Sequence, residues 1–276
     1  MSAVLVLLML LAGCATGVAE AEVAESAVVR AVARVKVLTR VLALARGADR
    51  PLPTTVWHPA VLTGRHPILL FSHGLGGLPA HFTPLATTWA EAGFVVAAPA
   101  YPHTNARVRV DRHDIRNQPA DAAYVLDRVK ALDGSEGDLF AGHLDVGRVA
   151  AVGFSAGGTT TLGILRAGHD PALLAAVSIA GRRPLAEFGG TGVPVLFVHG
   201  DRDKVVPLSA GWAVFEAVPW PKRFVAVPGA GHGQYLRPGH PEFPRVAGLI
   251  LTFLRDRLDS PIWSEVPPVR TAEHAG

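Results

Sequence analysis

The sequence G-F-S-A-G at residues 153–157 constrains the fold more than any other segment of the chain. A β-branched apolar run at 146–152, typical of a buried strand, precedes it, and small residues at 158–166 that suit a buried helix follow it. A serine at such a strand-to-helix turn is held in a strained backbone conformation, and its hydroxyl is raised out of the sheet. The free N–H groups of the helix N-terminus then point at whatever the hydroxyl attacks. The sequence therefore predicts that Ser155 is a nucleophile.

A serine hydroxyl becomes reactive when an imidazole accepts its proton and a carboxylate orients that imidazole. In chains with this turn, the acid and then the histidine follow the serine. An apolar strand at 193–200 runs into Asp201 and Asp203, and a strand at 223–227 is followed by His232 in a loop of small residues. The order and spacing predict a Ser–Asp–His catalytic triad.

The identity of the acid stays open between two residues. Asp201 directly follows the strand and can cap the turn through its own backbone, so we prefer Asp203. Among the other histidines, His199 ends a strand and is expected to be packed or turn-bonded, whereas His240 lies in a surface loop. We therefore expect His232 to be the base.

A glycine-rich turn follows an early predicted strand. The strand covers residues 67–72, and the turn at 73–77 reads H-G-L-G-G, a pattern that presents a backbone N–H to the nucleophile. The second donor is the N–H of the residue after the serine. This predicts an oxyanion hole formed by the backbone N–H groups of Leu75 and Ala156. His73 is expected to bond the backbone of the turn.

Together these motifs resemble the α/β-hydrolase superfamily over residues 51–258. The segments R-P-L-P-T-T-V-W-H-P at 50–59, F-S-H-G-L-G-G at 71–77 and G-F-V-V-A-A-P at 93–99 resemble secreted dienelactone-hydrolase-like esterases. Those esterases are relatives of platelet-activating-factor acetylhydrolases and of bacterial lipase/cutinase-type polyester hydrolases. The resemblance implies an α/β fold with a mostly parallel sheet of about eight strands flanked by helices. It also implies hydrolysis of carboxylic esters with no metal and no organic cofactor.

The chain departs from the polyester hydrolases in one respect. It has one cysteine and so lacks their C-terminal disulfide. For that reason a specialised polymer-degrading role is not expected.

The region around the site is expected to be an open groove. Only residues 180–192 separate the strand predicted at 173–179 from the next one, so no large lid domain is predicted. Besides Leu75 and Ala156, the groove walls are expected to include Leu78, His103, Arg182 and Trp212. The polar loop at 101–118 can either hold an acidic part of a substrate or be solvated. Its basic residues are Arg107, Arg109, Arg112 and His113.

The N-terminal segment indicates export. Residues 3–12 are almost wholly apolar, too few to span a bilayer, and typical of a signal-peptide core. The segment ends in L-A-G-C, which resembles a bacterial lipobox in which Cys14 is acylated, although the first two residues carry no positive charge. A plain cleaved signal and an incidental buried cysteine are the alternatives. We expect either a membrane-anchored lipoprotein on the cell envelope or a secreted protein.

The chain is expected to contain one folded domain. Its predicted parts are a signal or lipobox segment at 1–14, a linker at 15–27, an α/β-hydrolase domain at 28–259 and a flexible tail at 260–276. Within the domain, 28–45 predicts a first strand, with a helix as the alternative. Helices are predicted at 81–92, 117–132 and 243–258.

Composition agrees with one globular domain. Hydrophobic residues make up 49% of the chain and charged residues 18%, which fits a large buried sheet. The net charge is +3, and the arginines are scattered without a nucleic-acid-binding motif, so nucleic acid is not an expected partner. The expected protein is a monomer that acts on a small-molecule or lipid ester.

Two other functions compete with the preferred prediction, an exported serine hydrolase that cleaves carboxylic esters through an acyl-enzyme. Thioesterases, peptidases and amidases use the same triad and differ only in the leaving group. A non-catalytic binding lipoprotein would usually lack the nucleophile, acid or histidine, and all three are present in this sequence.

Overall fold

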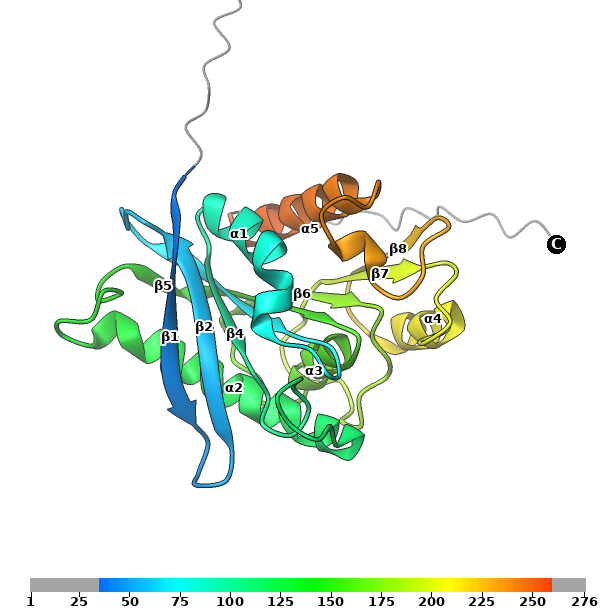
Figure 1. Cartoon of the computed structure of the whole chain (residues 1–276), viewed down its shortest axis with the longest axis horizontal. Coiled ribbons are helices and arrows are strands. Elements are labelled where there is room, and N and C mark those ends of the chain that lie inside the picture. Colours follow the sequence, from blue (N-terminus) through cyan, green and yellow to red (C-terminus); the bar gives the residue numbers. More distant parts are fainter. Residues whose placement is uncertain (1–34, 260–276) are drawn as a thin grey trace, which may run out of the picture. The chain divides into compact units, whose positions relative to one another are not determined.

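The computed structural model describes residues 35–259, so Cys14, the predicted linker and the predicted tail lie outside the described residues. Within this range the chain forms one eight-stranded sheet in the order β1-β2-β4-β3-β5-β6-β7-β8 (Figure 1). The strands are β1 (Val37–Ala45), β2 (Pro51–Pro59), β3 (His66–Ser72), β4 (Val95–Pro99), β5 (Leu144–Phe154), β6 (Leu173–Ile179), β7 (Val195–Gly200) and β8 (Lys222–Val227). Of the segment predicted at 28–45, Val37–Ala45 is therefore a strand, and the helix alternative is wrong for these residues.

The sheet has an antiparallel edge and a parallel remainder. β2 pairs antiparallel with both β1 and β4, whereas all pairs from β4 to β8 are parallel. Every residue of the central strand β4 is buried, as expected for a parallel strand covered on both faces, while β1 at the sheet edge leaves Leu38 and Val41 exposed.

Helices cover both faces of the sheet (Figure 1). They are α1 (Thr83–Glu91), α2 (Gln118–Ala131), α3 (Ala156–Ile164), α4 (Leu208–Ala217) and α5 (Phe243–Leu258), with short 3₁₀ turns η1 (Pro79–Phe82), η2 (Arg112–Asn117), η3 (Leu132–Gly134) and η4 (Gln234–Leu236). One apolar core joins the sheet to α2, α3 and α4, and a second joins its other face to α1 and α5. This is the α/β-hydrolase fold that the sequence predicted.

The carboxyl ends of the parallel strands bring the predicted site residues to one edge. The turn with Leu75 follows β3, Ser155 follows β5, Asp203 follows β7 and His232 follows β8. In open parallel sheets this is the edge at which ligands bind. The described segment between β6 and β7 contains no helix, so no lid of that kind covers the edge. None of the described helices is long and apolar enough to cross a membrane.

A buried ion-pair cluster fixes η2 and α2 to the start of β2. The Arg50 guanidinium donates to both carboxylate oxygens of Asp114 at 2.9 and 2.8 Å, and it also bonds Asp121 on α2. Arg50 is 8% exposed, and these hydrogen bonds raise the pKa of Arg50 above its usual value. Moving η2 away would leave the buried charges of Arg50 and Asp114 unpaired, which is costly, and this keeps η2 in place.

Candidate active site

Ser155 occupies a strained turn between β5 and α3. Its backbone has φ 54° and ψ −116°, values that L-residues rarely adopt. The N–H of Ser155 donates to the Ile179 carbonyl on β6 at 2.8 Å, which ties the turn to the neighbouring strand.

The glycines on either side of Ser155 are required by the close approach of backbone segments. A Cβ at position 153 would lie 2.0 Å from the Gly157 carbonyl oxygen, and a Cβ at 157 would lie 2.0 Å from the Ser72 carbonyl oxygen on β3. No larger residue fits at either position unless the backbone moves. The G-x-S-x-G pattern is thus enforced by contacts with β3 and α3.

The imidazole of His232 connects the serine to an acid. Its Nε2 lies 2.9 Å from Ser155 Oγ, and its Nδ1 lies 2.7 Å from Asp203 Oδ2. With Nδ1–H donating to the carboxylate, Nε2 has a free lone pair that can accept the serine proton. The ring packs against Phe154, with 4.9 Å between ring centroids, so a neighbouring side chain fixes its position.

Backbone N–H groups orient the carboxylate of Asp203. Oδ1 accepts from the N–H groups of Val205 and Val206 at 2.8 and 2.9 Å, which leaves Oδ2 for the imidazole. Burial opposes ionisation of the Asp203 carboxyl, but the hydrogen bonds from His232 and these two N–H groups outweigh it, and the pKa of Asp203 is lowered. The site therefore holds a buried carboxylate in its ionised form.

The structure distinguishes the alternatives that the sequence left open. Asp201 is exposed and its side chain has no partner among the described residues, so Asp203 is the aspartate next to His232. His199 is buried, and its Nε2 bonds the Val206 carbonyl at 2.8 Å, as expected for a packed histidine. Burial lowers the pKa of His199 and favours its neutral form.

The turn after β3 presents a free N–H to the same region. Within the described chain, neither the backbone N–H of Leu75 nor that of Ala156, the first residue of α3, has a protein acceptor. His73 braces this turn: its Nδ1 bonds the Gly74 carbonyl at 2.8 Å, and its Nε2 accepts from the Tyr101 N–H at 3.2 Å. The predicted structural role of His73 is confirmed.

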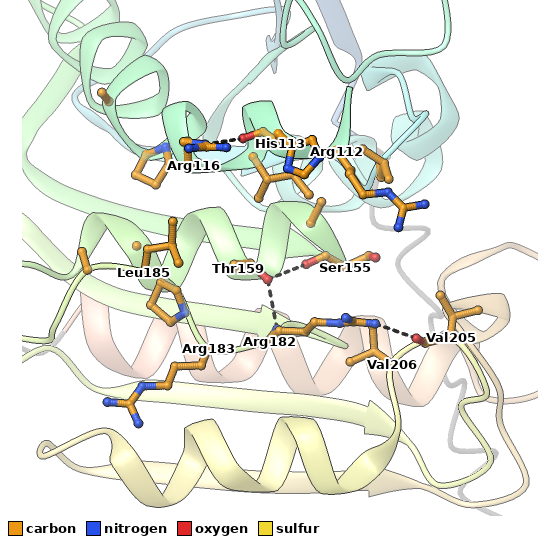
Figure 2. A pocket seen from close by; sticks show the side chains of 18 of the residues that line it. Arg112, His113, Arg116, Ser155, Thr159, Arg182, Arg183, Leu185, Val205 and Val206 are labelled. Atoms are coloured by element: carbon orange, nitrogen blue, oxygen red, sulfur yellow. Dashed lines mark hydrogen bonds between the residues drawn. The ribbon is translucent and has the colours of Figure 1, made fainter. Parts of the chain in front are cut away.

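A groove of about 930 Å³ opens beside Ser155 and His232 (Figure 2). Figure 2 shows η2 on one side of the groove, the segment after β6 with Arg182 and Arg183 on the other, and α3 between them. The lining residues are Leu75, Arg112, His113, Ile115, Arg116, Pro119, Ala120, Ser155, Ala156, Thr159, Gly163, Arg166, Arg182, Arg183, Pro184, Leu185, Ala186, Val205, Val206 and His232.

Three of the expected wall residues are absent from this lining. Leu78 precedes η1, His103 is exposed on the loop after β4, and Trp212 packs against Phe215 of α4 and Phe224 of β8. Of the predicted walls, Leu75, Ala156 and Arg182 do line the groove. Arg112 and His113, named above on the polar loop at 101–118, also line the groove, whereas Arg107 and Arg109 do not, and the sequence did not predict that this part of the loop forms η2. Its signal was Asp111, whose carboxylate caps the N–H of His113.

The edge of this sheet thus carries a serine, an imidazole and a carboxylate in one hydrogen-bonded chain, with two free N–H groups nearby. Among the described residues no cluster of histidine, cysteine, aspartate or glutamate is arranged to hold a metal ion. The fold and this edge define an α/β-hydrolase. Over residues 45–235 the chain matches the family described as PETase, PET hydrolase-like. It belongs to this family and is a carboxylic ester hydrolase. A comparison with curated proteins finds no match.

Proposed function

We propose that this protein is a serine esterase in which Ser155, His232 and Asp203 form the catalytic triad. The observation that carries the proposal is the continuous chain of two hydrogen bonds, 2.9 Å from serine to imidazole and 2.7 Å from imidazole to carboxylate. The distances lie within the range needed for proton transfer between a nucleophile and its base.

In the proposed reaction, Ser155 Oγ attacks the ester carbonyl carbon while its proton passes to His232 Nε2. The backbone N–H groups of Leu75 and Ala156 donate to the oxyanion that forms on the carbonyl oxygen. The imidazolium then gives its proton to the departing alkoxide, which leaves an acyl-enzyme and a free alcohol. In the second half, water attacks the acyl carbon while His232 Nε2 takes its proton, the bond from the acyl carbon to Ser155 Oγ breaks, and the imidazolium returns the proton to Oγ as the acid product leaves.

The buried carboxylate of Asp203 supports both halves of this cycle. It holds the imidazole in the tautomer with a free Nε2, and it stabilises the positive charge that the ring gains. Because two backbone N–H groups fix its other oxygen, Asp203 cannot rotate away when the imidazolium forms.

The test compares the wild type with Ser155→Ala. We expect the variant to fold, to lose reaction with a fluorophosphonate probe, and to hydrolyse p-nitrophenyl esters at least about 10³-fold more slowly. Acyl-CoAs and peptide amides in the same assay separate an esterase from a thioesterase or an amidase. Labelling that persists in Ser155→Ala would overturn the choice of nucleophile.

Polyester hydrolysis is a second candidate, because the family match is to PET hydrolase-like proteins. An open groove can admit a chain end that an enclosed pocket would exclude. Release of soluble aromatic acids from an amorphous poly(ethylene terephthalate) film, absent with Ser155→Ala, would support it. Activity on soluble esters alone would restrict the enzyme to small substrates.

We also propose that the enzyme is a monomeric, exported lipoprotein anchored through Cys14, or else secreted. The support is the apolar run at 3–12 and the L-A-G-C sequence that ends it. The lipid chains would hold a folded domain at the membrane surface, since each buried CH₂ contributes ~0.8 kcal/mol.

A further inference from the structure

The groove beside Ser155 is lined by a set of cationic side chains. Five arginines of the described chain lie on it, and no aspartate or glutamate is among its lining residues. They come from η2, the turn after α3 and the segment after β6, and they are Arg112, Arg116, Arg166, Arg182 and Arg183. We call these five residues the arginine set.

Most of the arginine set has no counter-charge within the described chain. Arg112 and Arg166 make no side-chain hydrogen bond or ion pair there, and Arg116 donates only to the neutral carbonyl of His113. Arg182 likewise donates to the Val205 carbonyl at 2.8 Å. Only Arg183 reaches a carboxylate, Glu187, at 3.2 Å. Four guanidinium groups therefore leave their positive charge uncompensated along one groove.

Two walls, one with Arg112 and Arg116 and the other with Arg182 and Arg183, face each other across α3 (Figure 2). In the view of Figure 2, Arg112 lies above Ser155, and Arg182 lies below it. The upper wall is held in place, because Asp114 on η2 is bonded to the buried Arg50. Arg112 therefore lies on a segment that is ordered without substrate, so substrate binding does not have to order this wall.

Between the cationic walls the groove is largely apolar. Ile115, Pro119, Pro184, Leu185 and Val206 line it together with Ala156, the residue after the nucleophile. A hydrocarbon or aromatic chain can lie against these side chains, while a charged end reaches a guanidinium. The groove thus suits a substrate with an apolar body and an anionic end.

We propose, on the basis of the ester hydrolysis proposed above, that the groove selects esters whose acyl chain ends in an oxyanionic group, a carboxylate or a phosphate-like group. The planar guanidinium forms paired hydrogen bonds with either group, and these charge-assisted bonds are stronger than neutral ones. Arg112 is the principal binding residue, assisted by Arg116. The anionic end takes no part in the bond changes at the ester, so its recognition acts on substrate binding and orientation.

The experiment uses pairs of p-nitrophenyl esters of equal chain length. The mono-p-nitrophenyl esters of adipic and suberic acids are compared with p-nitrophenyl hexanoate and octanoate, and a terminal phosphonate of the hexanoyl ester distinguishes the two kinds of anion. The ratio of kcat/KM for the anionic over the neutral ester is measured in wild type, Arg112→Gln, Arg112→Gln/Arg116→Gln and Arg109→Gln. Arg109 is exposed on the same loop, does not line the groove, and changes the net charge equally.

We expect Arg112→Gln to lower this ratio about three- to tenfold and the double variant to lower it further, whereas Arg109→Gln leaves it within twofold of wild type. The wild-type ratio should also fall as salt is raised from 0.02 to 0.5 M. An unchanged ratio in the double variant, or an equal fall with Arg109→Gln, would overturn the inference. Loss of the proposed function itself has a separate signature, because hydrolysis of the neutral esters would then persist in Ser155→Ala.

Discussion

The buried imidazole of His73 should make the stability of this enzyme depend on pH below neutrality. The ring is 1% exposed, and both of its nitrogens are used. Nδ1–H donates to the Gly74 carbonyl, and Nε2 accepts from the Tyr101 N–H. A proton on Nε2 would face that N–H without water to solvate the charge. Burial accordingly lowers the pKa of His73 from its usual value of 6.5 to about 4.

The size of the effect follows from this shift. In the unfolded chain the ring takes up a proton near its ordinary pKa, so the unfolded state binds protons first as the pH falls. The stabilisation from a neutral His73 is complete above about pH 6.5, it declines as the pH falls between the unfolded and the folded pKa, and its loss is complete once the pH has fallen through the folded value of about 4. At about 1.4 kcal/mol per pKa unit, His73 should cost the fold about 2 kcal/mol between pH 7 and pH 5.

Urea unfolding at pH 7, 6 and 5 measures this loss in wild type and His73→Asn. The variant should be less stable at every pH, because the acceptor for Tyr101 is gone, but its stability should fall about 2 kcal/mol less over this range. The buried His199, whose pKa is also lowered, titrates equally in both proteins and cancels. His113→Gln, which removes an exposed imidazole, is the control. A pH dependence in His73→Asn as steep as in wild type would refute the reasoning.

Three further outcomes can be measured. Asp203→Asn should lower kcat about 10³–10⁴-fold: the Val205 and Val206 N–H groups will hold the amide oxygen, so the amide NH₂ faces His232 and forces the tautomer with Nε2 protonated. Asp201 is exposed, and Asp201→Asn should keep kcat within about twofold of wild type. A large loss of kcat in Asp201→Asn with little loss in Asp203→Asn would assign the role of the acid to Asp201. Ser155→Gly should be inactive yet more resistant to urea than Ser155→Ala by about 1 kcal/mol, because glycine tolerates φ 54°, and equal stabilities would contradict strain at this turn. Cys14→Ser should release active enzyme from membranes, whereas an unmodified mature N-terminus other than Cys14, with fully soluble wild type, would favour plain secretion.

The sequence predicted those parts of the site that depend on short motifs and on the order of these motifs along the chain. The turn around Ser155 is dictated by glycines next to a strand, and Asp203 and His232 each follow a strand of their own, so the sheet edge brings them together. The choice between Asp201 and Asp203 depended instead on the N–H groups of Val205 and Val206, which are placed by the folding of the loop.

The sequence predicted only part of the groove wall, because tertiary contacts decide which residues face the groove. The segment Arg112–Asn117 has no apolar period, and its place beside α3 depends on Asp114 bonding Arg50, 64 residues away. Trp212 looked like a wall residue by type, yet its ring packs on Phe224 and it does not line the groove. Residues that bind a substrate only through such long-range placement leave little pattern in a single sequence.

The glycine contacts around Ser155 have a consequence for how this enzyme can diverge. The catalytic turn is locked backbone to backbone at Gly153 and Gly157, so almost any substitution there removes the activity together with the fold. The groove wall at 183–186 lies in the loop between β6 and β7 and belongs to neither strand. Substitutions in that wall can therefore change substrate specificity while the position of Ser155 is kept. A library for new ester substrates should vary Arg183 and Leu185 and leave the glycines fixed.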